Sequence, residues 1–222
     1  AREADAPWPD VVSAVLSMIA VLSLVYGIKL FAHSGVNLAV GAALLAGLLM
    51  AALFVRRQKR LADPLIDLAL FRRPAFSTAL AVNIFGFFIA FGSFLLIAQY
   101  LQLALGLSPL EAGLWSAPSG IAFVAGALLT PLMTRIVAPP RLVALALTVA
   151  AGGFVMLGIG DDPDLAPVVA GYVIFSFGLA PVFTLTTDLI VSAAPPERAG
   201  SAAGIAETST ELGGALGIAL LG

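Results

Sequence analysis

Two glutamates near the C-terminal end of the chain have the residue type and the spacing to exchange a proton for a cation. Glu207 and Glu211 lie in an otherwise apolar run, 200–222, beside Thr208 and Thr210. Four residues apart on a helix, the two carboxylates share one face. Away from water they resist ionising together, so the pair can hold a proton at neutral pH and exchange it for a positively charged solute. The alternative is a hydrogen-bonded pair that only holds helices together.

The depth of these glutamates favours the first interpretation. If a helix enters the membrane near Arg198, Glu207 lies about 13 Å and Glu211 about 20 Å along its axis, at a rise of about 1.5 Å per residue. A carboxylate at the centre of a membrane helix costs roughly 2.5–3.5 kcal/mol on insertion scales. Acids are therefore rare in such places and usually serve a function.

Asp188 is a third candidate for binding protons or cations. It lies only about one turn from the end of an apolar run, 166–190. A carboxylate at that depth either takes part in the same chemistry or pairs with Arg198 or Arg141 near the membrane surface.

A second set of residues could line a cavity for a ligand. Aromatic walls suit lipophilic cations through apolar contact and cation–π attraction. The candidates are Asn83, Phe87, Phe91, Gln99 and Phe123. The same phenylalanines could instead face lipid, and the amides could tie neighbouring helices together.

The composition of the chain indicates that these residues lie in a membrane protein. Of the 222 residues, 60% are hydrophobic and 11% are charged, and the mean hydropathy is +1.06. A soluble domain keeps about a quarter of its residues charged. The apolar runs are long and unbroken, which favours helices over the alternating strands of a barrel. We therefore predict an all-α, polytopic membrane protein.

Seven runs are long enough to cross the hydrocarbon, which takes about 20 apolar residues. The predicted spans are 11–29, 37–55, 76–101, 110–132, 141–159, 166–190 and 200–222. The predicted organisation is a helix pair in 1–55, a linker in 56–75 and a five-helix bundle in 76–222. The linker mixes basic and apolar residues, so we expect an interfacial amphipathic segment; the alternative is a plain loop.

The basic residues predict the orientation of these spans. Ten of the eleven lysines and arginines fall on one side if the seven spans alternate, and six of them lie within 56–73. The positive-inside rule therefore puts the N-terminal end and the 56–75 linker in the cytoplasm. Lys29 is the one basic residue expected on the outer side, and His33 is expected in an outer loop.

Several other functions have little support in the sequence. The chain has no cysteine and one histidine, so thiolate and multi-histidine metal sites are excluded, and no cofactor is expected. A net charge of −2 argues against nucleic acid as a partner. The chain lacks an initiator Met and ends inside an apolar run, so we expect it to be part of a longer protein.

Four strings resemble a known transporter family. They are VYGIK at 25–29, RRQKRLADPLIDLALFRRPAF at 56–76, QYLQLALGLSPLEAGLWSAP at 99–118 and APPERAGSAAGIAETSTELGGALGIALLG at 194–222. The chain resembles the major facilitator superfamily, and within it the fourteen-span drug/proton antiporters of the QacA, SmvA and LfrA type. The last two strings are the most specific.

This resemblance implies an architecture and an activity. The first two spans would be the extra central helix pair, and the next five would begin the C-terminal six-helix bundle. The N-terminal bundle and the last helix would lie outside this chain and be its partners. By resemblance, Glu207 and Glu211 serve cation recognition and proton coupling in a bacterial cytoplasmic membrane. The expected substrates are lipophilic cations such as dyes and quaternary ammonium compounds.

The chain departs from that family in two places. Some members have an acid midway along the fourth span, but residues 119–123 contain none, which argues against divalent substrates. The basic loop motif of facilitators is reduced in residues 134–141.

Three alternative functions stay open to different degrees. A facilitator that carries another small solute would share the fold and differ in its cavity. An intramembrane protease would need a histidine base near Ser119, but His33 is predicted at the outer surface. A retinal protein would need a lysine in mid-helix, and Lys29 is predicted at a helix end.

Overall fold

The computed structural model describes residues 10–61, 64–158 and 164–222. These residues form two compact units, one ending at Arg72 and one beginning at Arg73. Each unit is described by itself. All regular secondary structure in the described part of the chain is helical, as predicted.

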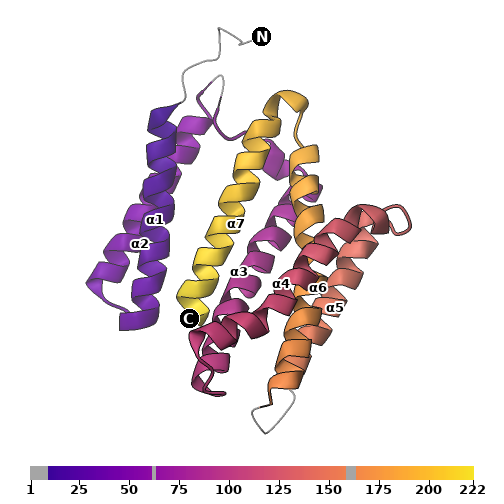
Figure 1. Ribbon diagram of the computed structural model, residues 1–222. Coiled ribbons are helices and arrows are strands. Elements are labelled where there is room, and N and C mark those ends of the chain that lie inside the picture. The colour runs from indigo at the N-terminus through magenta and orange to yellow at the C-terminus, as the bar shows by residue number, and fades with distance from the viewer. Residues whose placement is uncertain (1–9, 62–63, 159–163) are drawn as a thin grey trace. The chain divides into compact units, whose positions relative to one another are not determined.

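The first unit is a pair of neighbouring helices, α1 (Val11–Ser34) and α2 (Leu38–Gln58) (Figure 1). Asp10 and Asn37 cap their N-termini by accepting hydrogen bonds from backbone amides three residues on. Gly35, with φ +64°, turns the chain between them in a conformation that favours glycine. A 3₁₀ turn, Leu70–Arg72, ends the unit.

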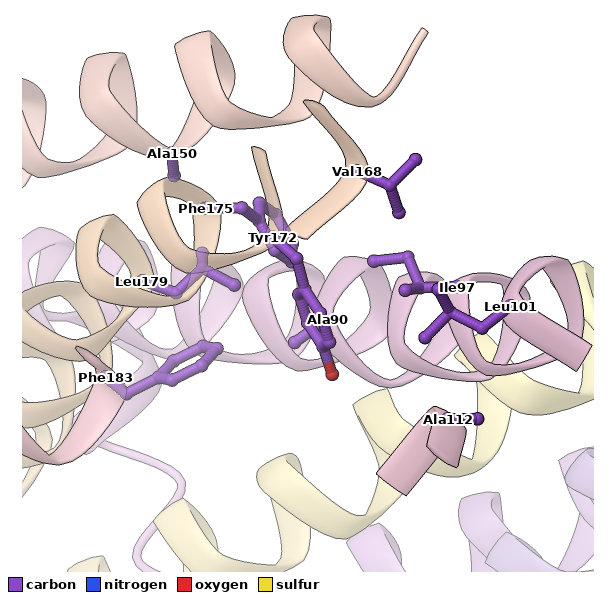
Figure 2. Close-up of a cluster of buried hydrophobic side chains, with 10 residues drawn as sticks. All are labelled: Ala90, Ile97, Leu101, Ala112, Ala150, Val168, Tyr172, Phe175, Leu179 and Phe183. Atoms are coloured by element: carbon purple, nitrogen blue, oxygen red, sulfur yellow. The ribbon is translucent and has the colours of Figure 1, made fainter. Parts of the chain in front are cut away.

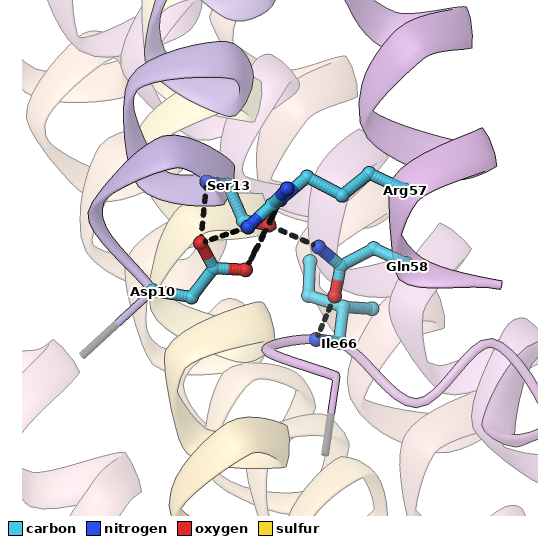
Figure 3. A network of polar contacts seen from close by, with 5 residues as sticks. All are labelled: Asp10, Ser13, Arg57, Gln58 and Ile66. Carbon is cyan, nitrogen blue, oxygen red and sulfur yellow. Dashed lines mark hydrogen bonds and ion pairs between the residues drawn. The ribbon is translucent and has the colours of Figure 1, made fainter. Parts of the chain in front are cut away.

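A polar network joins both helices of this unit to the linker (Figure 3). The guanidinium of Arg57 lies 2.9 Å from a carboxylate oxygen of Asp10 and donates to the hydroxyl of Ser13. The buried amide of Gln58 donates to Ser13 over 2.7 Å and accepts from the backbone N–H of Ile66. Hydrogen bonds from Arg57 and then from Ser13 lower the pKa of Asp10 from 3.8 to about 2. The start of α1, the end of α2 and the linker are thus held together.

The described part of the second unit contains five α-helices, four of which pack against the fifth. They are α3 (Pro74–Leu103), α4 (Pro109–Met133), α5 (Pro139–Leu157), α6 (Leu165–Ser192) and α7 (Ala199–Leu221). The most buried of them is α6, which packs against α3, α4, α5 and α7 (Figure 1). Another 3₁₀ turn, Pro196–Arg198, precedes α7.

Local sequence explains where these helices begin. Proline is the first residue of α3, α4 and α5, where its missing N–H costs nothing. Ser108 and Glu111 form a reciprocal capping box at the start of α4. Asp164 caps α6 by accepting from the N–H of Ala166.

Close helix contacts in this unit depend on glycines, which have no side chain. A Cβ added at Gly153 of α5 would collide with the backbone of α6, and one added at Gly178 of α6 would collide with α5. A Cβ at Gly126 of α4 would lie 2.8 Å from the carbonyl oxygen of Phe177. Four residues after Phe177, Pro181 lies inside α6; Pro118 and Pro131 lie inside α4.

The apolar core lies where α3, α4 and α5 meet α6. Figure 2 shows its side chains: Ala90, Ile97, Leu101, Ala112, Ala150, Val168, Tyr172, Phe175, Leu179 and Phe183. Three of these residues, Tyr172, Phe175 and Phe183, are aromatic, and all three come from the central helix, α6. Burial of this cluster fixes α6 as the element to which the others attach.

All seven predicted spans are helices, and most boundaries differ by only a few residues. The largest differences are at the ends of α1, which runs to Ser34, and of α2, which runs to Gln58. His33 therefore belongs to the last turn of α1, which corrects its placement in a loop, and Lys29 lies within the helix rather than at its end. Among the described residues, six helices are long and apolar enough to cross a membrane; α7 is long enough but more polar. Its lower hydropathy reflects the two glutamates and their hydroxyl neighbours.

Candidate functional site

The rotation of α7 is set by a polar contact with α3 and α6. The side chain of Asn83, on α3, is completely buried. Its amide nitrogen donates to the hydroxyl of Ser209 over 2.7 Å and lies 3.2 Å from that of Thr210. Its amide oxygen accepts from the hydroxyl of Thr186, on α6, over 3.1 Å. We call these four side chains the Asn83 hub.

Two glycines bring α7 directly against the backbone of α3. A Cβ added at Gly213 would collide with the carbonyl oxygen of Ile84, and one at Gly217 with that of Phe88. The other pair with the same spacing, Gly200 and Gly204, has no atoms from elsewhere in the described chain within 4 Å of an added Cβ. The same four-residue glycine spacing therefore corresponds to a helix contact at Gly213 and Gly217 but not at Gly200 and Gly204.

These contacts turn both glutamates away from α3. Each helical residue advances about 100° around the axis, so Glu207 and Glu211 point about 200° from Ser209, which lies between them. Both are exposed, and neither has a hydrogen bond or ion pair among the described residues. Thr208 is exposed on the same side, while Ala206 is buried against the bundle. The structure therefore brings the predicted acid pair together on one free face of α7.

Asp188 lies near the C-terminal end of α6 and is also exposed. The structure shows no hydrogen bond or ion pair between Asp188 and another described residue, including the two arginines considered as partners. Asp188 precedes Ser192, the last residue of α6, by about one helical turn.

A cavity of about 390 Å³ opens between α3, α4 and α6, near the middle of each helix. We call it the aromatic cavity. Its walls are Phe87, Ala90, Phe91, Phe94, Ser119, Gly120, Phe123, Val124, Tyr172, Ser176 and Phe183. None of these side chains is charged, and the only polar groups are three hydroxyls. The cavity can therefore enclose an apolar or aromatic body without supplying an ion-pair partner.

The rings of this cavity contact one another across helices. Phe87 and Phe183 stack with centroids 3.9 Å apart and planes 17° apart. Phe123 approaches Phe183 from α4 with centroids 6.1 Å apart, and Phe94 approaches Tyr172 at 5.6 Å. Such ring pairs contribute about 0.5–1.5 kcal/mol beyond burial alone. They give the cavity a firm aromatic wall.

The predicted lining residues divide into two groups. Phe87, Phe91 and Phe123 line the aromatic cavity. Asn83 does not: it lies inside the α3–α6–α7 interface. Gln99 is exposed near the end of α3 and is likewise not part of the cavity wall.

Sequence reasoning missed the contribution of α6 to this cavity. Tyr172, Ser176 and Phe183 supply its back wall. Their spacing, four and then seven residues, puts all three on one helical face. A search for polar and aromatic residues on one face of the sixth span could therefore have found them. Among the described residues, no three or more His, Asp or Glu side chains are grouped so that they could hold a metal ion.

The fold and the candidate site together indicate a class of membrane protein. Several long apolar helices that satisfy their own backbone hydrogen bonds, with carboxylates and a cavity near their middle, are typical of a multi-pass membrane transporter. The chain belongs to the Major Facilitator Superfamily, whose family model matches residues 11–218. Members of this family are transporters and not enzymes.

Curated relatives carry names connected with drug export. The chain is 36% identical to the multidrug efflux pump LfrA of Mycolicibacterium smegmatis over 96% of its own length and 42% of that protein. It is 34% identical to the tetracenomycin C resistance and export protein of Streptomyces glaucescens, over 96% and 40%. It is 33% identical to the methyl viologen resistance protein SmvA of Salmonella typhimurium, over 94% and 43%. The chain thus spans about two fifths of these relatives.

Proposed function

We propose that this chain forms the C-terminal portion of a proton-coupled antiporter that exports lipophilic cations across the cytoplasmic membrane. Its partners would be protons, membrane lipid and the N-terminal bundle of the same transporter. Membership of the Major Facilitator Superfamily and the names of the relatives support an export function. The proton and cation chemistry rests on the acid pair of α7.

The observation that carries this proposal is the free face of α7. Glu207 and Glu211 are held on one side of a helix whose other side is packed against α3. Facing lipid, each ionised carboxylate would cost roughly 2.5–3.5 kcal/mol. We therefore expect the rest of the transporter, or a water-filled path between its halves, to cover this face. There the pair can alternate between binding a proton and binding a cation.

The aromatic cavity supplies the second requirement, a place for the apolar body of the substrate. Its mid-helix position and its volume suit a small planar aromatic molecule. Ring faces also attract a cation by about 0.5–2 kcal/mol, more when water is excluded. Asp188, nearer the end of α6, could receive a cation or proton on its way to or from the acid pair.

The experiment measures efflux of ethidium, a fluorescent cation, driven by a proton gradient in vesicles that contain the complete protein. We expect Glu207→Gln and Glu211→Gln each to slow efflux by roughly tenfold or more, equivalent to at least about 1.4 kcal/mol of lost stabilisation. Each glutamine keeps the shape of the side chain and removes its titration. Efflux should also lose its dependence on the proton gradient.

Glu111→Gln is the matched control. Glu111 is a carboxylate in the first turn of α4. Glutamine can also fill its role in the capping box. Its variant should transport like the unaltered protein. Normal gradient-driven efflux in both α7 variants would refute proton coupling through this pair.

The uncharged lining of the aromatic cavity favours one second candidate, a facilitator for a neutral apolar solute. The same vesicles loaded with Nile red, a neutral dye, separate the two functions. Export of Nile red that persists in both α7 variants, without export of ethidium by the unaltered protein, would favour the neutral carrier.

A further inference from the structure

The hydroxyls around Asn83 do not need Asn83 to be satisfied. Thr186 lies 2.8 Å from the carbonyl oxygen of Val182, one turn earlier in its own helix. Ser209 and Thr210 each reach the carbonyl oxygen of Ala206 in the same way. The hub is therefore an added connection between helices, because the buried hydroxyls have other hydrogen-bond acceptors within their own helices.

The amide of Asn83 differs from these hydroxyls, because it connects three helices at one point. Its nitrogen faces α7 and its oxygen faces α6. Ser209, the residue it holds most closely, lies midway in sequence between the two glutamates. Each glutamate points about 200° around the axis of α7 from Ser209. Holding Ser209 against α3 therefore directs Glu207 and Glu211 away from α3.

No other described group takes over this orienting role at the glutamates themselves. The elements packed against α7, with their capping residues, bear four charged side chains whose positions are described: Arg73, Asp188, Arg198 and Asp164. The first three lie near the end of the bundle at which α7 begins, and Asp164 caps the opposite end of α6. The tyrosines of these elements, Tyr100 and Tyr172, lie on α3 and α6 farther from that end. The orientation of the acid pair is thus set by packing on the far side of α7.

We propose that Asn83 is a positioning residue for proton coupling: its amide fixes the rotation of α7 and thereby the direction in which Glu207 and Glu211 face. The inference rests on the proposed function of that pair. The glycine contacts at Gly213 and Gly217 hold the C-terminal half of α7 against α3, so the effect of the hub should be larger at Glu207 than at Glu211.

The test replaces Asn83 by leucine, which has a similar volume and no hydrogen-bonding group. Since every hydroxyl keeps an acceptor in its own helix, we expect the complete protein to fold with little change in thermal stability. We expect the maximal rate of gradient-driven ethidium efflux to fall roughly tenfold and its pH profile to shift. Asn83 does not line the aromatic cavity, so these changes would act through the acid pair.

A second variant and a control make the result decisive. Ser209→Ala combined with Thr210→Val removes the α7 side of the hub and should reproduce the altered pH profile, even if the leucine variant does not fold. Thr148→Val removes an exposed hydroxyl that bonds only within α5 and should leave transport unchanged.

Background variants separate this inference from the proposed function. In a protein that already carries Glu207→Gln and Glu211→Gln, Asn83→Leu should cause no further loss, because both changes act through the same pair. An unaltered pH profile in both hub variants, while the glutamate variants lose coupling, would overturn the positioning role alone. Glutamate variants with normal coupling would overturn the proposed function.

Discussion

Asp10 shows how a single carboxylate can combine two local roles. It caps α1 and pairs with Arg57 at the end of α2. Asparagine would keep the cap and lose the ion pair, because Asn and Asp are about equally good at this position. The substitution Asp10→Asn therefore isolates the contribution of the pair to stability.

We expect Asp10→Asn to lower the thermal stability of the protein in detergent at neutral pH. The pKa of Asp10 is about 2 when folded, below its ordinary value of 3.8, so its stabilising effect is present above about pH 4. That effect is lost as the pH falls from about 4 towards 2. The difference in melting temperature between the two proteins should therefore be constant above about pH 5 and shrink below it.

Asp164→Asn provides the comparison for this prediction. Asp164 also caps a helix, α6, and forms no ion pair with another described residue. It should show little change at any pH. Equal losses in both variants would mean that the Arg57 pair contributes nothing measurable.

The shared helical face of Glu207 and Glu211 could be predicted from the sequence, because two carboxylates four residues apart in an apolar run are conspicuous. Its direction could not. The bond that turns α7 joins Asn83 to Ser209, 126 residues away, and no local pattern reveals that pairing. For the same reason Asn83 was expected at a cavity and is found in a helix interface.

At the scale of elements, neighbouring glycines on α5 have opposite surroundings. Gly153 is buried against the backbone of α6, and Gly152 is exposed with nothing within 4 Å of an added Cβ. Their helix and their sequence neighbourhood are the same. Any difference between their alanine variants therefore reports the α5–α6 contact alone.

We expect Gly153→Ala to destabilise the bundle by about 1–3 kcal/mol, because a methyl group there forces two backbones apart. Gly152→Ala should be neutral or stabilising by up to about 1 kcal/mol, the ordinary preference of a helix for alanine. Thermal unfolding in detergent measures both. A Gly153→Ala variant as stable as its neighbour would show that α5 and α6 can separate at no cost.

The helices themselves were predictable from length and hydropathy, while their contacts were not. Prolines and capping residues indicate where α3 to α6 begin, and the apolar runs indicate where they continue. The two glycine pairs of α7 show the limit of such patterns. Only the packed partner decides which pair becomes an interface.

At the scale of the whole molecule, the distribution of basic residues predicts which helix ends share a side of the membrane. The turn after α1 and the turn after α4 should lie on opposite sides, with the second one cytoplasmic. Val36 and Ile136 lie in these turns, and each is 88% exposed. Residues 1–222 contain no cysteine, so a thiol placed at either position is unique within this portion.

We expect a membrane-impermeant maleimide to label Val36→Cys in intact cells and Ile136→Cys only in inverted vesicles. Both positions are equally open, so a difference in labelling reports sidedness and not burial. Labelling of both from the same side would contradict the predicted alternation of the helices. Labelling with the sides exchanged would reverse the orientation and remove the cytoplasmic assignment of the 56–75 linker.

The meeting of Pro181, Phe177 and Gly126 has a mechanical consequence. Proline has no N–H to donate, so Pro181 cannot form a hydrogen bond to the carbonyl oxygen of Phe177. The helix α6 therefore lacks one backbone hydrogen bond near its middle. Bending the helix there breaks one backbone hydrogen bond fewer than elsewhere, and the absent side chain of Gly126 leaves clearance for the carbonyl oxygen of Phe177. The half of α6 that bears Tyr172 can therefore tilt while the half that bears Thr186 stays attached to α3 and α7.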